Sequence, residues 1–134
     1  MKVVINRCFG GFALSREAVM LYAKLKGITL YPFIDRITKE VYGDKATLDN
    51  PHILIHYATQ ECSTEEELND HYFSDHDIPR DDESLVQVVK ELGKRANSPF
   101  SKLKVIKIPD GVEWQIEEYD GMEHIAEKHR TWGW

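Results

Sequence analysis

The N-terminal stretch 3–26 constrains the fold more than any other part of the chain, because it joins signals for a buried strand, a turn and a helix. Its first residues (3–5) form a β-branched run, which is typical of a strand buried on both faces. We therefore predict a central strand near 3–7. Gly10 and Gly11 follow, and because glycines allow a positive φ or a close backbone approach, we expect the chain to turn there.

A helix is predicted directly after this turn, over 16–26. Ser15 can accept hydrogen bonds from the first backbone N–H groups of the helix, and Gly27 follows as a C-terminal stop. The apolar residues of the segment predict a broad buried stripe, made of Ala18, Val19, Met20, Tyr22, Ala23 and Leu25.

The same stretch is the candidate ligand site, because a strand, a glycine turn and a helix N-terminus present unpaired N–H groups to a phosphate or carboxylate. It lacks the Lys-Ser/Thr pair of a P-loop and the third glycine of a dinucleotide-binding loop. The competing interpretation is a tight turn whose phenylalanines fill the core. The candidate ligand-binding residues are Arg7, Cys8, Phe9, Gly10, Gly11, Phe12, Ser15, Arg16 and Arg80.

Length and composition exclude several classes of protein. A chain of 134 residues suits a single domain, and a net charge of −6 makes a nucleic-acid partner unexpected, because such binders present a basic face. No run reaches about 18 apolar residues, which predicts a cytoplasmic protein without a membrane partner. The two cysteines, Cys8 and Cys62, form no zinc pattern, and we expect no cofactor.

The central part of the chain predicts two strands separated by a polar excursion. Residues 28–34 are rich in β-formers, and Pro32 places this strand at an edge or across a bulge. Residues 52–57 have an apolar core that suggests a central strand, and a brief pairing is predicted within 39–42.

The acidic stretch 61–83 is expected to be the least regular part, with Ser63 or Thr64 capping a short helix through Leu68. It contains residue types that ligate divalent metals, and His52 or His56 could join them. Because the spacing matches no named metal site, we interpret the stretch as a polar surface loop without a metal. The residues of this cluster are Asp70, His71, Asp75, His76 and Asp77.

The clearest helix signal covers 82–92, where Asp81 or Asp82 can act as the cap and Gly93 as the stop. Arg80 lies just before it, either as a ligand-binding arginine or as the ion-pair partner of the two aspartates. We favour the ion pair, because such pairs are common and need no function.

The C-terminal part predicts strands over 103–108 and 112–119, joined by a turn at 109–111. After them, Asp120-Gly121 either forms a type I′ turn into another strand or begins a helix. We favour the hairpin. The tail ends in Trp132 and Trp134, which must pack on the domain or form an interface, for which a homodimer is the simplest arrangement.

Together these signals predict an α+β fold: a single domain with a mixed, mostly antiparallel sheet of about five strands and two main helices packed on it. The first strand, helix and second strand are expected to form a right-handed crossover.

Three segments of the chain resemble a family of small uncharacterised proteins of bacteriophages and their bacterial hosts. They are I-N-R-C-F-G-G-F-A-L-S, D-I-P-R-D-D-E-S-L-V-Q-V-V-K-E-L-G and I-P-D-G-V-E-W-Q-I-E-E-Y-D-G-M-E-H-I-A-E-K-H-R-T-W. The resemblance covers both ends and misses roughly residues 28 to 75, and it brings no activity with it. It implies a protein of the host cytoplasm that binds host factors or small signalling molecules.

The leading functional hypothesis is a non-enzymatic binder of a phosphorylated or nucleotide-like small molecule or of a host protein. An alternative is a hydrolase or transferase in which Cys8 is the nucleophile and His56 or His124 assists it. A second alternative is a protein-interaction module that uses the acidic stretch 61–83 and the tryptophan tail.

Overall fold

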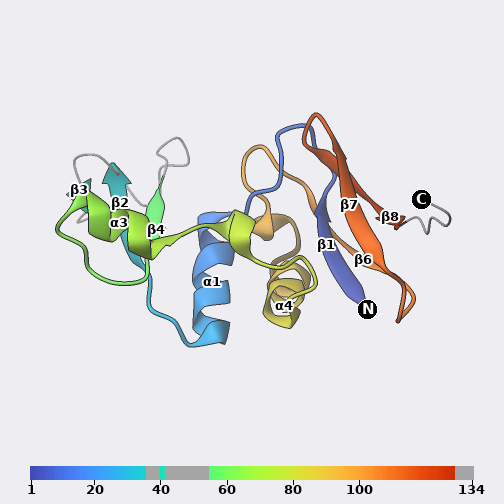
Figure 1. Ribbon diagram of the computed structural model, residues 1–134, viewed down its shortest axis with the longest axis horizontal. Helices are drawn as coiled ribbons and strands as arrows, with labels where there is room; N and C mark the ends of the chain where they lie inside the picture. Colours follow the sequence, from blue (N-terminus) through green and yellow to red (C-terminus); the bar gives the residue numbers. More distant parts are fainter. Residues whose placement is uncertain (36–39, 42–54, 129–134) are drawn as a thin grey trace, which may run out of the picture. The chain divides into compact units, whose positions relative to one another are not determined.

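The structure is a computed structural model that describes residues 1–35, 40–41 and 55–128 (Figure 1). The chain divides into two compact units, one made of residues 1–18 and 78–134 and the other of residues 19–77. Both contain helical and antiparallel strand elements, so the predicted α+β class is confirmed. The single domain stays a prediction, and each unit is described by itself below.

The first unit is built around β1 (Lys2–Asn6), which pairs antiparallel with β6 (Leu103–Lys107). Val3, Val4 and Ile5 are buried, as the β-branched run predicts. The expected central position in a larger sheet is wrong, because among the described residues β1 forms a two-stranded sheet with β6. Helix α4 (Glu83–Leu92) contacts both strands and buries its apolar residues.

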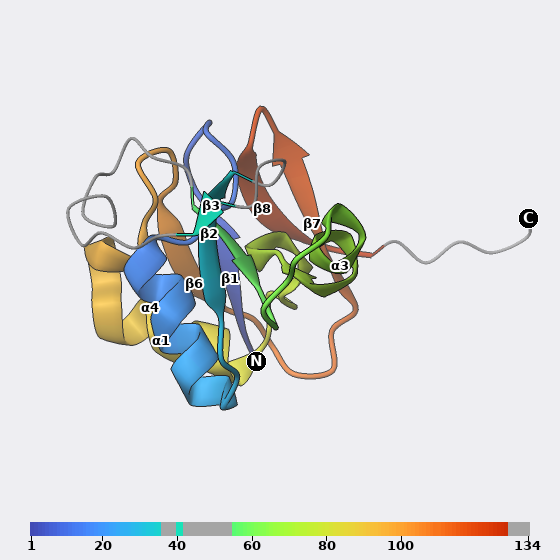
Figure 2. The same ribbon diagram turned by 90° about the vertical axis from the view of Figure 1, so that its left-hand side faces the viewer.

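The second edge of β1 is closed by groups from distant segments. The Val4 N–H donates to the carbonyl of Arg80 at 2.8 Å, and the Asn6 N–H donates to a carboxylate oxygen of Glu123 at 2.8 Å. Figure 2 shows β1 between β6 and β8, the strand that carries Glu123. A buried strand edge needs such partners, because an unpaired N–H group away from water is costly.

The hairpin formed by β7 (Trp114–Tyr119) and β8 (Met122–Glu127) confirms the hairpin prediction, and the alternative helix is wrong. Asp120 has a φ of 48° and Gly121 a φ of 86°, as a type I′ turn requires. Strand β7 begins two residues later than predicted.

Helices α1 (Arg16–Lys26) and α4 agree closely with the sequence signals. The Ser15 hydroxyl accepts from the Ala18 N–H at 3.1 Å, and the Asp82 carboxylate accepts from Ser84 and Leu85. The buried stripe of α1 is narrower than expected, because Met20 is exposed. Leu25 is exposed as well, and the residues that remain buried are Ala18, Val19, Tyr22 and Ala23.

The second unit contains a four-stranded antiparallel sheet in the order β3-β2-β4-β5. Its strands are β2 (Tyr31–Asp35), β3 (Glu40–Val41), β4 (His56–Ala58) and β5 (Tyr72–Phe73). Pro32 therefore lies in an interior strand, so its expected edge position is wrong. The predicted alternative was a bulge, and the pairing of β2 with β3 has a register shift between Phe33 and Asp35, next to Pro32.

The predicted single sheet and the predicted crossover are both wrong, because β1 and β2 belong to separate sheets. Helix α3 (Glu65–His71) is capped by Thr64 and runs beyond Leu68, where we expected it to end. Two short 3-10 turns, η1 (Asp75–Asp77) and η2 (Gly93–Ala96), follow α3 and α4. The predictions for His52, Trp132 and Trp134 lie outside the described residues.

Candidate functional site

The glycine turn after β1 is held between two other loops. Gly11 has a φ of 93°, which confirms the predicted positive φ. A Cβ at Gly10 would lie 2.0 Å from the carbonyl oxygen of Phe100, and a Cβ at Gly121 would lie 2.5 Å from that of Phe9. Glycine is therefore needed at both positions because two backbones approach closely, as they do at the top of the first unit in Figure 1.

Hydrogen bonds fix the segment that follows the glycine turn against the segment after α4. The Ser15 N–H donates to the Ala96 carbonyl at 2.9 Å, and the Ser101 hydroxyl donates to the Ala13 carbonyl at 2.7 Å. Ser15 Oγ also donates to a backbone carbonyl of η2 at 2.6 Å. Its hydroxyl is thus occupied within the fold, which weakens its assignment as an anion ligand.

Asn6 joins three segments beneath the turn and has no exposed surface. Its Nδ2 donates to the carbonyls of Cys8 at 2.6 Å and Gly121 at 2.8 Å, and its Oδ1 accepts from the Lys102 N–H at 2.9 Å. Because every polar group of this buried side chain is paired, Asn6 fixes the relative positions of the turn, the hairpin and β6.

Arg80 lies against the same network and forms a bidentate ion pair with Glu123, at 2.6 Å and 2.9 Å. The two side chains are 16% and 5% exposed. The guanidinium also lies over the ring of Phe12, 3.6 Å from its centroid. The partner is therefore neither of the neighbouring aspartates, and the contacts assign Arg80 and Phe12 to the core.

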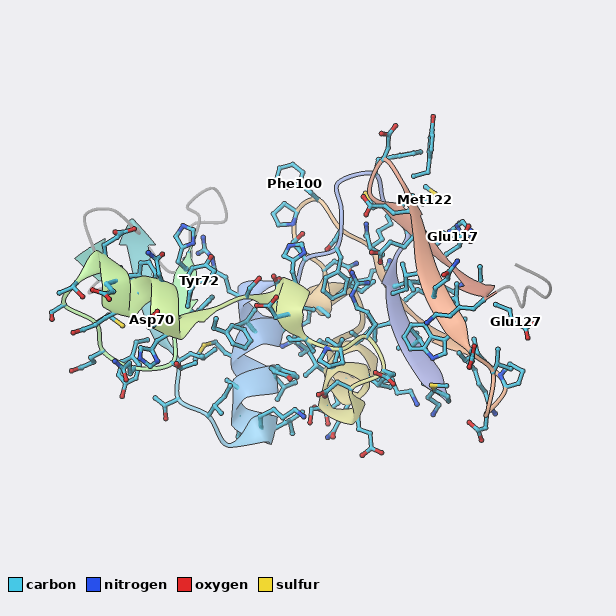
Figure 3. All side chains as sticks on the ribbon, in the orientation of Figure 1. Asp70, Tyr72, Phe100, Glu117, Met122 and Glu127 are labelled. Carbon is cyan, nitrogen blue, oxygen red and sulfur yellow. The ribbon has the colours of Figure 1, made fainter. Side chains whose placement is uncertain are left out.

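The groups of the proposed cysteine enzyme are not assembled among the described residues. Cys8 is half-buried, and no hydrogen bond joins it to a histidine of the described residues. His124 pairs with Glu117 at 3.1 Å on the face of the hairpin opposite Glu123, and Glu117 points away from β1 in Figure 3. His56 belongs to the second unit, where its Nδ1 lies 2.8 Å from the Tyr72 hydroxyl.

A hollow of about 580 Å³ lies between the glycine turn and the hairpin tip, and it is open to solvent. One side is formed by residues of the glycine turn, and the other side by residues of the hairpin tip, two of which are acidic. The residues that line it are Phe9, Gly10, Gly11, Glu118, Asp120 and Gly121.

Two phenylalanine rings lie exposed at this end of the unit. Phe9 is 63% exposed and lines the hollow, while Phe100 is 72% exposed and packs its Cβ side against Gly10. Figure 3 shows Phe100 projecting outward from its loop. We call Phe9, Gly10, Phe100, Glu118 and Asp120 the loop-end surface.

No family model, curated protein or solved structure matches this chain. The resemblance to phage proteins therefore stays a prediction. Within the described part of the chain, no helix is long and apolar enough to span a membrane. The described residues also contain no group of three His, Cys, Asp or Glu side chains that could hold a metal.

The remaining candidates divide between the fold and the surface. Arg7 is bound within the fold, because its Nη1 donates to the Glu123 carbonyl at 2.7 Å. Arg16 lies in the first turn of α1 and is half-buried. Sequence reasoning found Phe9 and Gly10 of the loop-end surface but missed Phe100, Glu118 and Asp120. An aromatic residue after Ser-Pro in a polar loop is a local signal that could have indicated Phe100.

Proposed function

We propose that the protein is a non-enzymatic binding module that recognises a protein partner through its loop-end surface. The observation that carries the proposal is the exposure of Phe9 and Phe100 on two segments that meet at Gly10. Burying one phenylalanine side chain stabilises a complex by roughly 1.5–3 kcal/mol. Exposed apolar patches of this kind mark interaction sites, and aromatic side chains are enriched in interfaces.

A protein suits this surface better than a small molecule does. Small-molecule sites enclose most of the ligand, whereas this hollow is open and Phe100 lies outside its lining. A partner that covers both phenylalanines must extend beyond the hollow. The resemblance to phage proteins implies that this partner is a protein of the bacterial host.

A phosphorylated or nucleotide-like ligand is less well supported by the geometry. Glu118 and Asp120 are among the residues that line the hollow, and their charges repel an anion. The Gly11 N–H, which an anion would need, is directed at the Cys8 carbonyl at 3.5 Å. A cysteine enzyme lacks support as well, because a nucleophile needs a base within hydrogen-bonding distance.

Selection from a random peptide library tests the proposal. The wild-type protein should enrich peptides that a Phe9→Ser/Phe100→Ser variant binds at least about tenfold more weakly, because two buried rings are lost. Tyr119→Ser is the matched control: Tyr119 is 74% exposed, but it lies opposite Met122 on the other face of the hairpin from Glu118.

Circular dichroism should show that both variants melt like the wild type, since the substituted side chains are exposed. Failure to enrich any peptide, or equal binding of the peptides by the double variant, would overturn the proposal. A loss with Tyr119→Ser as large as that with the double variant would contradict the assignment to the loop-end surface.

A further inference from the structure

The chemistry of the hollow identifies the kind of group that the partner inserts. Glu118 and Asp120 both line it, and neither forms an ion pair with any residue in the described part of the chain. Two other exposed acids of this unit are paired: Glu117 with His124, and Glu17 with Arg95. The two carboxylates of the hollow are therefore available to a ligand.

The Glu118 side chain forms no hydrogen bond or ion pair with the described residues that would stabilise the fold. In the register of the hairpin it lies directly opposite Glu123, whose charge is compensated by Arg80. Glu123 is needed for the buried pair with Arg80, whereas Glu118 contributes no such contact. The hairpin therefore does not require a charge at position 118, and the carboxylate is available to a ligand.

The aromatic side of the hollow has the complementary property. The face of a phenylalanine ring carries partial negative charge and attracts cations, most strongly when water is excluded. Phe9 and the two carboxylates thus all favour a positive group. The Arg7 guanidinium, the nearest cation in the sequence, is already directed to the Glu123 carbonyl.

We propose that the hollow takes the guanidinium or ammonium head of an arginine or lysine side chain, and that the partner presents it from a basic segment. This inference rests on the proposed function and specifies its ligand. The hollow of about 580 Å³ has room for one such side chain, while Phe100 contacts an apolar neighbour of the inserted residue.

The test uses ¹⁵N-labelled full-length protein and two blocked amino acids of the same shape. N-acetyl-arginine N-methylamide carries the charge, and its citrulline analogue does not. At about 10 mM, a concentration suited to a single side-chain contact, the arginine probe should shift the amide signals of Gly10, Gly11 and Gly121. The citrulline probe should leave them unchanged.

Two variants separate charge from shape. Glu118→Gln/Asp120→Asn should weaken binding of the arginine probe about fivefold, as expected for two exposed charges. The variant should fold, because Asn-Gly suits a type I′ turn and Glu118 has no ion-pair partner among the described residues. Glu117→Gln, on the opposite face, is the matched control and should bind like the wild type.

Equal shifts with both probes, no shift with the arginine probe, or an unchanged affinity of the double variant would overturn the inference. So would shifts of the same glycines by inorganic phosphate in place of arginine. Selected peptides that depend on Phe9 and Phe100 but contain no basic residue would refute the cation site and leave the proposed function standing. A selection that enriches no peptide would refute the proposed function itself.

Discussion

The buried ion pair between Arg80 and Glu123 allows the sharpest prediction about stability. The Glu123 carboxylate is 5% exposed and accepts three hydrogen bonds, two from Arg80 and one from the Asn6 N–H. In Glu123→Gln the amide keeps the shape, but its NH₂ group must face one of these donors. The Arg80 charge also loses its partner.

Breaking a buried pair in this way costs about 3–5 kcal/mol, and we expect the lower end because Arg80 remains 16% exposed and stacks on Phe12. The loss is a large fraction of the roughly 5–15 kcal/mol that stabilises a typical domain. Urea denaturation followed by circular dichroism measures it. With a slope of about 1–3 kcal/mol per molar urea, a loss of about 3 kcal/mol should lower the midpoint by roughly 1–3 M.

A double-mutant cycle identifies the cause. Arg80→Leu alone should also be strongly destabilising, because it leaves a buried carboxylate without its cation. The Arg80→Leu/Glu123→Gln variant should be more stable than the sum of the two single losses by about 2 kcal/mol. Glu117→Gln, in an exposed pair on the same hairpin, should change stability by less than about 0.5 kcal/mol. A loss below about 1 kcal/mol in Glu123→Gln, or additivity in the cycle, would refute the reasoning.

Three further predictions concern other parts of the molecule. Gly121→Ala should destabilise the protein far more than Gly11→Ala in thermal denaturation, because a Cβ at Gly121 would lie 2.5 Å from the Phe9 carbonyl oxygen, while the space at Gly11 is open. Gly11→Ala should cost about 1 kcal/mol. Equal losses in the two variants would contradict the close approach at Gly121. Burial of the thiol, with a smaller contribution from the Glu67 carboxylate, raises the pKa of Cys62. Alkylation of Cys62 by iodoacetamide near neutral pH should therefore be slower in the folded than in the unfolded protein, and faster in folded Glu67→Gln than in the folded wild type. Equal rates would count against this. A hydrogen bond with Lys2, together with burial and repulsion by the Lys2 charge, lowers the pKa of Lys90 in the folded state. The free energy of unfolding should therefore rise as pH increases from this lowered pKa toward 10.5, because the unfolded state then binds more protons. Lys2→Gln should raise the melting temperature at pH 7, and the increase should be smaller at high salt, which screens the repulsion between the two lysines.

Local signals predicted the helices and the C-terminal hairpin well. The cap and stop of α4 are Asp82 and Gly93, both neighbours of the segment that they terminate. The Asp120-Gly121 turn depends on two adjacent φ angles, which the two residue types favour on their own. Interactions of this range are readable from a sequence because every partner lies within a few residues.

Sheet partners were predicted less well, because pairing depends on segments that are far apart in the chain. Local pattern indicated that β1 is buried but not that its second edge is covered by Arg80 and Glu123. A β-branched run predicts that the strand is buried, and the N–H groups along a buried strand edge need hydrogen-bond acceptors. A neighbouring strand can supply these acceptors, and so can single groups such as the Arg80 carbonyl and the Glu123 carboxylate. The expected five-stranded sheet therefore became separate smaller ones.

The sequence by itself determined the elements: which residues form helices, where the hairpin turns, and that the segment after β1 needs glycine. The tertiary structure alone decided what the glycines are for. Gly10 meets the Phe100 segment and Gly121 meets Phe9, contacts that span about 90 and 110 residues of chain and leave no local pattern. The same long-range packing leaves Phe9 exposed and sets it beside Glu118 and Asp120, which converts an expected anion cradle into a surface suited to a cation.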